Sequence, residues 1–289
     1  MRTVGLLFSV LFLLGCSQAS ETPPDAAPVI AAERAFAAEA REIGWVEAFE
    51  RHSTAEAIVL GARPRNAHEA MAGIDPANRG DTSLTWAPEF AGISRGGDIG
   101  FTTGPFNGGD AAFGQYFTVW RRQGDGSWKW IYDGGTNQTT PNRPDPAFAV
   151  EELPVGARGA GSAAAALEAV HRREEALAAA AAESAGKAYA EVFATTGRMN
   201  RDEQPTAVGP DAAEGLAGAG PVRFSPPQMA EAGAAGDLVF TLGEARWEGG
   251  SGYYQRIWVL QRDGWRIGYD QILLRSLEEM APPVETPTP

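Results

Sequence analysis

The stretch GDIGFTTG at residues 97–104 decides the fold of this chain, because it returns as GDLVFTLG at residues 236–243. The signals around it return in the same order and at the same spacing, so that WAP at 86–88 matches FSP at 224–226. Two further matches are Gly114-x-Tyr116-x-x-x-Trp120 with Gly252-x-Tyr254-x-x-x-Trp258, and WKWIYD at 128–133 with WRIGYD at 265–270. Composition alone does not produce such an ordered series, so the sequence predicts a duplicated domain.

The first sixteen residues are typical of a bacterial export signal. Arg2 precedes an apolar run at residues 4–14, which is too short to cross a bilayer as a helix. The ending LLGC at 13–16 resembles a lipoprotein box, in which Cys16 carries the lipid. Cys16 is the only cysteine among 289 residues, which favours this dedicated role over an ordinary signal cleaved near Ala19.

This resemblance implies a protein anchored in the bacterial cell envelope by lipid on Cys16 and facing the periplasm. Two or more acyl chains hold a protein stably on a membrane. By resemblance to enterobacterial sorting signals, Ser17 after the cysteine favours the outer membrane. A net charge of −13 argues against nucleic acid as a partner, because phosphates attract a basic surface.

The segments between these signals give the domain organisation. After the signal peptide at 1–16, residues 17–30 are small, polar and rich in proline, as in a tether. In each copy a helical pattern comes first and glycine-punctuated hairpins follow, which predicts the α+β class. The predicted units are a first domain at 31–138, a linker at 139–162, a second domain at 163–277 and a disordered tail at 278–289.

The helical halves also correspond in outline. A helix is expected over about 31–42, with Gly44 interrupting it before a shorter helix. In the second copy we expect Gly186 to break the longer helix at 162–183 in the same way. Asp98 and Asp237 each follow a glycine, where turn residues are expected.

The first copy is similar to the nuclear transport factor 2-like (SnoaL-like) superfamily, in particular a bacterial branch described as a domain of unknown function. The resemblance covers roughly residues 31–138. The motifs that carry it are GWxxAF at 44–49, WxP at 86–88, GDIGFTTG at 97–104, and YFTVWRR at 116–122 followed by GSWKWIYD at 126–133. The second copy keeps the Gly-Asp strand but replaces Trp86 with Phe224, and it differs more in its helical half.

The resemblance implies two cone-shaped, cystatin-like domains, each with N-terminal helices packed on a curved antiparallel sheet. The open end of such a cone often forms a pocket. Single domains of this superfamily commonly pair through their sheets. We therefore expect the two copies to form a pseudo-dimer within one chain, since a short linker makes their pairing intramolecular.

Strict alternation along the last strand of the first copy predicts two faces. It places Trp128, Trp130 and Tyr132 on one side and Lys129, Ile131 and Asp133 on the other. The second copy repeats the pattern over residues 265–270. The aromatic face is explained either as the wall of a ligand pocket or, as we favour, as domain core or a sheet face packed on the other copy.

The candidate pocket residues of the first copy are Trp86, Tyr116, Trp120, Asp133 and His52. Their counterparts in the second copy are Phe224, Tyr254, Trp258 and Asp270. A carboxylate among aromatic walls has the raised pKa that acid or base catalysis needs, whereas an exposed Asp at a strand end only caps a turn. His52 is expected either at the mouth of a pocket or at the C-terminus of a helix.

No cofactor or metal site is predicted. His52, His68 and His171 lack the spacing of metal ligands. GISRG at 92–96 fits the serine hydrolase pattern, but a strand is expected after its serine where that motif requires a helix. Catalytic residues are therefore unassigned, and enzymatic activity is less favoured.

The leading hypothesis is a non-catalytic module of the envelope that binds a small apolar ligand or a protein partner. The alternative is a dehydratase- or isomerase-type enzyme with Asp133 as acid or base and Tyr116 as hydrogen-bond donor. Related cones with such activity place a carboxylate inside, often with a Tyr or His.

Overall fold

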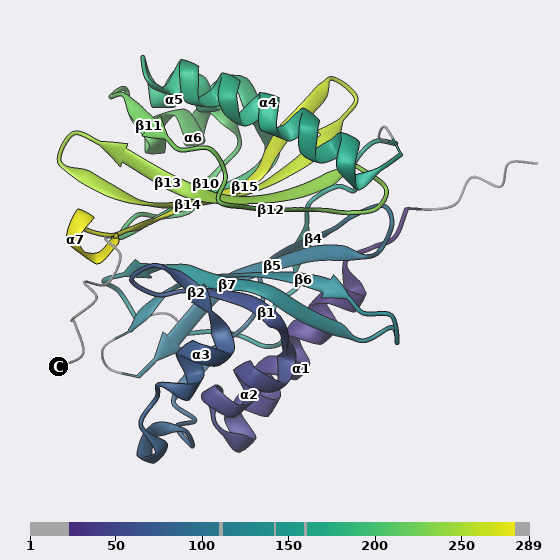
Figure 1. The fold of residues 1–289 in the computed structure, drawn as a ribbon, viewed down its shortest axis with the longest axis vertical. Helices are drawn as coiled ribbons and strands as arrows, with labels where there is room; N and C mark the ends of the chain where they lie inside the picture. Colours follow the sequence, from purple (N-terminus) through teal and green to yellow (C-terminus); the bar gives the residue numbers. More distant parts are fainter. Residues whose placement is uncertain (1–22, 110–111, 142, 159–160, 281–289) are drawn as a thin grey trace, which may run out of the picture.

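Two layers of sheet face each other at the centre of the molecule, with helices on both outer sides (Figure 1). The computed structural model describes residues 23–109, 112–141, 143–158 and 161–280. Each half of the chain builds one curved sheet and covers its outer face with its own helices. The predicted α+β class, with two cone-shaped domains, is confirmed.

The first domain has eight strands in the order β2-β1-β7-β6-β5-β4-β8, with β3 pairing on β5. All pairs are antiparallel except β1 with β7 and β4 with β8. Its elements are α1 (Ala27–Ile43), α2 (Trp45–His52), β1 (Ser53–Leu60), β2 (Pro64–Asn66), α3 (Ala67–Ala72), a 3-10 turn (Pro76–Asn78), β3 (Leu84–Trp86), β4 (Phe90–Ile93), β5 (Ile99–Gly108), β6 (Phe113–Arg122), β7 (Trp128–Gln138) and β8 (Glu151–Glu152).

The second domain repeats this topology with seven strands in the order β10-β9-β15-β14-β13-β11, and β12 pairs on β13. Its elements are α4 (Ala163–Ala181), α5 (Ala185–Val192), β9 (Phe193–Arg201), β10 (Ala207–Val208), α6 (Pro210–Ala217), β11 (Val222–Phe224), β12 (Met229–Ala232), β13 (Leu238–Trp247), β14 (Gly250–Gln261), β15 (Gly264–Leu274) and α7 (Leu277–Met280). No helix in the described ranges is both long enough and apolar enough to cross a membrane.

Several element boundaries differ from the sequence expectation. Helix α1 begins inside the segment expected to be a tether, because Pro28 fits the first turn of a helix. The expected linker contributes strand β8 and the buried Leu153. Residues 278–280 of the expected tail end helix α7. The signal peptide with Cys16, and the rest of the tail, lie outside the described residues.

The break between the two helices is made differently in the two copies. Gly44 ends α1 with a φ of 97°, and an added Cβ there would meet the Arg79 carbonyl oxygen at 2.5 Å. In the second copy the break falls at Ser184, so the expectation for Gly186 is wrong. Gly186 lies inside α5, where an added Cβ would meet the Glu214 carbonyl oxygen at 2.6 Å. Close packing of α5 on α6 therefore explains that glycine.

The repeated stretch joins the two halves through its aspartates. Asp98 accepts a hydrogen bond from the backbone amide of Ala234 at 2.7 Å, and Asp237 accepts one from the amide of Arg95 at 2.9 Å. Each aspartate therefore binds a turn of the other copy as well as standing in a turn of its own. The two contacts are thus reciprocal between the two domains.

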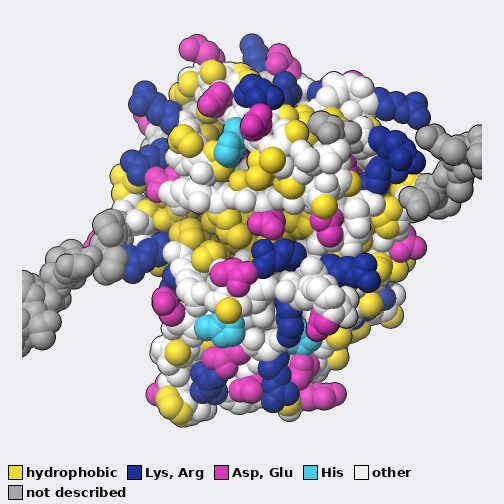
Figure 2. Space-filling view, turned by 45° about the vertical axis from the view of Figure 1, so that its right-hand side comes forward, with side chains coloured by type: hydrophobic (Ala, Val, Ile, Leu, Met, Phe, Trp, Pro, Cys, Tyr) yellow, Lys and Arg dark blue, Asp and Glu magenta, His cyan; other side chains and the backbone are white. Residues whose placement is uncertain are grey.

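The inner faces of the two sheets form a shared apolar core. Phe117 of β6 stacks on Tyr269 of β15, with ring centroids 4.5 Å apart, and Tyr132 lies 4.9 Å from Phe240. Figure 2 shows hydrophobic side chains along the seam between the domains, with charged side chains on the domain surfaces above and below it. Burial of this face explains why both copies keep apolar residues there.

A β-bulge in β7, and another in β15, overturns the predicted alternation. Trp120 pairs with Trp130 and Val119 pairs with Tyr132, so Ile131 has no partner on β6. The extra residue moves Tyr132 to the face between the domains and returns Asp133 to the face of Trp130, inside the cone. Gly268 is the extra residue of β15, where Ile257 pairs with Tyr269 and Trp258 with Ile267.

The shared core predicts the effect of truncating its central ring. Phe117→Ala should lower the free energy of unfolding by about 3–5 kcal/mol, since the fully buried ring leaves a cavity between the sheets. Denaturant unfolding measures this loss. The matched control is Phe148→Ala, whose ring is 39% exposed and whose loss should stay within about 0.5 kcal/mol. Equal effects of the two substitutions would contradict a shared core.

Candidate functional site

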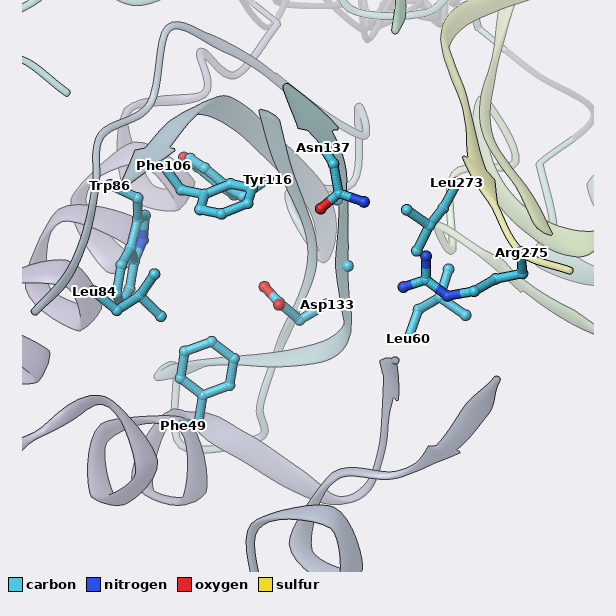
Figure 3. A pocket seen from close by; sticks show the side chains of 12 residues that line it. Phe49, Leu60, Leu84, Trp86, Phe106, Tyr116, Asp133, Asn137, Leu273 and Arg275 are labelled. Atoms are coloured by element: carbon cyan, nitrogen blue, oxygen red, sulfur yellow. The ribbon is translucent and has the colours of Figure 1, made fainter. Parts of the chain in front are cut away.

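A pocket opens at the end of the first cone, beside the second domain. Its volume is ≈ 200 Å³. In Figure 3 the Asp133 carboxyl points into it between Phe49, Trp86 and Tyr116, while Leu273 and Arg275 of the second domain form the opposite wall. Six of the side chains that line it are apolar or aromatic: Phe49, Leu60, Leu84, Trp86, Phe106 and Leu273. Four others carry polar groups: Tyr116, Asp133, Asn137 and Arg275.

Asp133 is the acidic group of this pocket. The bulge in β7 turns it into the cone, where its Oδ2 accepts a hydrogen bond from the Thr118 hydroxyl at 2.7 Å. Its side chain is only partly exposed, toward the pocket. Burial raises the pKa of this carboxyl to about 8; the bond from Thr118 opposes the rise and the neighbouring Glu33 adds to it. Asp133 can therefore exchange a proton near neutral pH.

Glu33 of α1 is a second buried carboxyl, which the sequence analysis missed. It is completely buried and accepts hydrogen bonds from Trp86 Nε1 at 2.5 Å, from Trp120 Nε1 at 3.0 Å and from the Thr102 hydroxyl. Burial raises its pKa, although these donors oppose the rise. A signal did exist, since Glu33 lies three residues before Phe36 on the apolar stripe of its helix.

The predicted pocket residues fall into three groups. Tyr116 and Trp86 line the pocket together with Asp133, and the Tyr116 hydroxyl is buried without a hydrogen-bond partner among the described residues. Trp120 is fully buried in the core behind them. His52 does not line the pocket. Its Nε2 lies 2.6 Å from Glu39 Oε2 on the side of the helices, where burial lowers its pKa and Glu39 opposes that change.

The second domain holds the same two carboxylates around an arginine. Glu174 of α4 accepts bonds from Trp258 Nε1 and the Thr241 hydroxyl, both at 2.7 Å, as Glu33 does from Trp120 and Thr102. Arg256 donates to Glu174 at 2.5 Å and to Asp270 at 2.7 Å. The register makes Arg256 the counterpart of Thr118, because each faces the aspartate of the neighbouring strand.

Arg256 is fully buried and enclosed by aromatic rings. Its guanidinium carbon lies 4.0 Å from the ring centre of Tyr254 and 4.1 Å from that of Phe224. Although burial alone would lower its pKa, Glu174, Tyr189 and Asp270 hold it well above the ordinary value. The carboxylates of the second cone are therefore neutralised from within.

The second domain also has a pocket, but that pocket does not reach its aspartate. Its volume is ≈ 250 Å³, and its walls include Tyr189, Val222 and Phe224 but neither Asp270 nor Tyr254. Arg201 binds the outer oxygen of Asp270 at 2.7 Å, and that carboxylate is fully buried. Of these two pockets, the first is therefore lined by the aspartate of its cone and the second is not.

The described residues contain no group of three or more His, Cys, Asp or Glu side chains placed to hold a metal ion. Ser94 of the GISRG sequence stands in the turn between β4 and β5, and its hydroxyl donates to Asp98 at 2.6 Å. No histidine base is bonded to it among the described residues.

Comparison with protein-family models gives no match for this sequence, and comparison with curated proteins gives none either. Solved structures do match, one domain's length at a time. A nuclear transport factor 2-like protein from Novosphingobium aromaticivorans is similar at 14% identity and a TM-score of 0.33, over 38% of this chain and 82% of that one.

Two further structures are similar to the same extent. A protein named as a candidate scytalone dehydratase from Novosphingobium aromaticivorans has 12% identity and a TM-score of 0.34, over 39% of this chain and 86% of that one. A cystatin-like fold protein from Burkholderia xenovorans has 15% identity and a TM-score of 0.34, over 39% and 94%. At such identities the likeness concerns the fold alone.

The state of Asp133 makes stability depend on pH. Its pKa rises from 3.8 to about 8 on folding, so the folded state binds more protons between these values and its stability falls as pH rises through that window. In Asp133→Asn this part of the pH dependence should vanish. Denaturant unfolding of both proteins at pH 4, 6, 8 and 9 measures it, and parallel curves would show that Asp133 titrates normally.

Proposed function

We propose that this chain is a lipid-anchored protein of the bacterial cell envelope whose first domain binds a small ligand in the pocket at Asp133. The second domain then serves as a structural copy. It completes the site by contributing Leu273 and Arg275 to the wall.

One observation carries this proposal: only the first of two homologous cones leaves its carboxyl group facing a pocket. The second cone closes the same position with Arg256 and Arg201. A purely structural pair of domains does not need an Asp133 that lacks an ion-pair partner among the described residues and lies among aromatic side chains. Such a wall, with a few polar groups, is typical of a small-molecule site.

The anchor and the pseudo-dimer are proposals that rest on different grounds. The signal and lipid-attachment sequence at 1–16 supports the envelope location. The apolar faces of the two sheets support a monomeric chain, since each domain supplies the cover that the other needs.

Matched pocket-filling variants test the ligand. Leu84 and Val222 hold equivalent places, each on the short strand at the mouth of its own pocket. In native mass spectrometry of protein purified from its own host, Leu84→Trp should lose a bound small molecule that Val222→Trp retains, because only the first pocket is blocked. The proposal fails if no bound mass is found on the unsubstituted protein, or if only Val222→Trp loses it.

A second function, acid–base catalysis of the dehydratase or isomerase type, is favoured by the pKa of Asp133 and by the unpartnered Tyr116 hydroxyl. An acid with a pKa of about 8 can give and take a proton at neutral pH. The Tyr116 hydroxyl can then donate to a developing oxyanion. His52, bonded to Glu39 outside the pocket, takes no part.

This alternative makes its own prediction. An enzyme of this type should exchange a proton next to a carbonyl group of the bound compound for solvent deuterium. Asp133→Asn should slow the exchange by about 10²–10⁴-fold, the usual contribution of a positioned acid or base. Exchange followed by NMR measures the rate, with His52→Asn as the control that leaves it unchanged. Binding without exchange would leave the non-catalytic function.

A further inference from the structure

We propose that the ligand of the first domain is an organic cation, an ammonium, amidinium or guanidinium group on a small apolar body. This inference rests on the proposed ligand-binding function and names the chemical class of the ligand. Its basis is the comparison of the two cones, because the second one already contains a cation at the equivalent position.

The second domain supplies the template. Arg256 of β14 places a guanidinium between the carboxylates of Glu174 and Asp270. In the first domain Thr118 occupies that register position, facing Asp133 across the β6–β7 pair. The threonine hydroxyl donates a hydrogen bond to Asp133 but carries no charge. The first cone therefore keeps both carboxyl groups but lacks the cation.

The first cone also keeps the aromatic walls of the cation site. Arg256 lies between the rings of Tyr254 and Phe224. By strand register their counterparts are Tyr116, which faces Gly104 as Tyr254 faces Gly243, and Trp86, which stands on β3 as Phe224 stands on β11. Both Tyr116 and Trp86 line the pocket. An aromatic pair of this kind attracts a cation through the faces of its rings, and Trp is the strongest of them.

The polar groups of the first cone lack an internal partner of the required charge. Neither Glu33 nor Asp133 forms an ion pair with a described residue, and the Tyr116 hydroxyl is buried without a partner. In the absence of a positively charged partner Asp133 keeps its proton, as its raised pKa shows. A bound cation would replace that proton and pair with the ionised carboxylate.

The other charged groups around the pocket are few. Glu33 lies behind Trp86 on the side of α1, and Arg275 is the one cation among the lining residues. Arg275 stands on the opposite wall, where its Nε donates to the Gly61 carbonyl at 2.9 Å and its Nη1 to that of Leu274 at 2.7 Å. An anion would therefore bind toward Arg275, and a cation toward Asp133.

Three probes of one shape test the charge. Benzamidinium, benzamide and benzoate differ mainly in carrying a positive, zero or negative charge on similar planar groups. Calorimetric titration at pH 8 of the chain beginning after Cys16 should show benzamidinium binding at least about tenfold more tightly than benzamide, with benzoate weaker still. Asp133→Asn should reduce the preference to less than about threefold.

The pH dependence gives an independent readout. Below the pKa of Asp133, cation binding must expel its proton, so benzamidinium affinity should rise with pH by up to about tenfold per unit and level off above pH 8. Titrations at pH 6 in two buffers of different ionisation enthalpy should show the release of up to one proton per site. Asp133→Asn should show no such release.

Thr118→Arg tests the internal template directly. Its guanidinium should take the place that Arg256 has in the second cone, so benzamidinium should no longer bind while the melting temperature stays at or above that of the unsubstituted protein. If this variant does not fold, the benzamide comparison and Asp133→Asn decide alone.

The outcomes separate the two proposals. Equal binding of benzamide and benzamidinium overturns the cation inference and leaves the ligand-binding function in place. Tighter binding of benzoate overturns it in favour of an anion at Arg275. If no probe binds and no host molecule is retained, the cation inference and the binding function both fail.

Discussion

A carboxylate buried under the long helix of each domain is the constraint on which both cones depend. Glu33 and Glu174 lie on the apolar stripe of α1 and α4, where an unpaired carboxylate would be very costly. Each is held by an indole and a hydroxyl from the facing sheet, Trp120 with Thr102 or Trp258 with Thr241. These bonds fix how the helix lies on the sheet, which in turn fixes where the cone opens.

The two domains share this arrangement of helix and sheet but differ in how the charge of the buried carboxyl groups is balanced. In the second domain Arg256 forms ion pairs with both carboxylates. In the first, a threonine leaves Asp133 to hold a proton beside an aromatic pocket. One register position on the sixth strand of each sheet therefore separates a cone whose aspartate is paired with an arginine from a cone whose aspartate faces a pocket. The surrounding topology is unaffected by this difference.

The order of helices and strands was predictable, because the motifs that occur in both copies mark turns and the starts of strands. The site was harder. Strict alternation along residues 128–133 put Asp133 on the wrong face, because the sequence does not reveal the bulge. The extra residue of a bulge can be of different types, and here it is Ile131 in one copy and Gly268 in the other. Glu33 was missed because an acidic residue in a helix is usually solvated. His52 was placed by sequence position alone, and its bond to Glu39 turns it away from the pocket.

The reciprocal bonds of Asp98 and Asp237 have an evolutionary consequence. Each aspartate binds the other half of the molecule, so substituting Asp98 or Asp237 would weaken the contact between the two halves. Gene duplication normally frees one copy to drift. Here the interior of each cone retains that freedom, as Thr118 and Arg256 illustrate, whereas the contacts between the halves constrain both copies together. The repeated Gly-Asp stretch is therefore preserved in both copies because each aspartate binds the other half of the molecule.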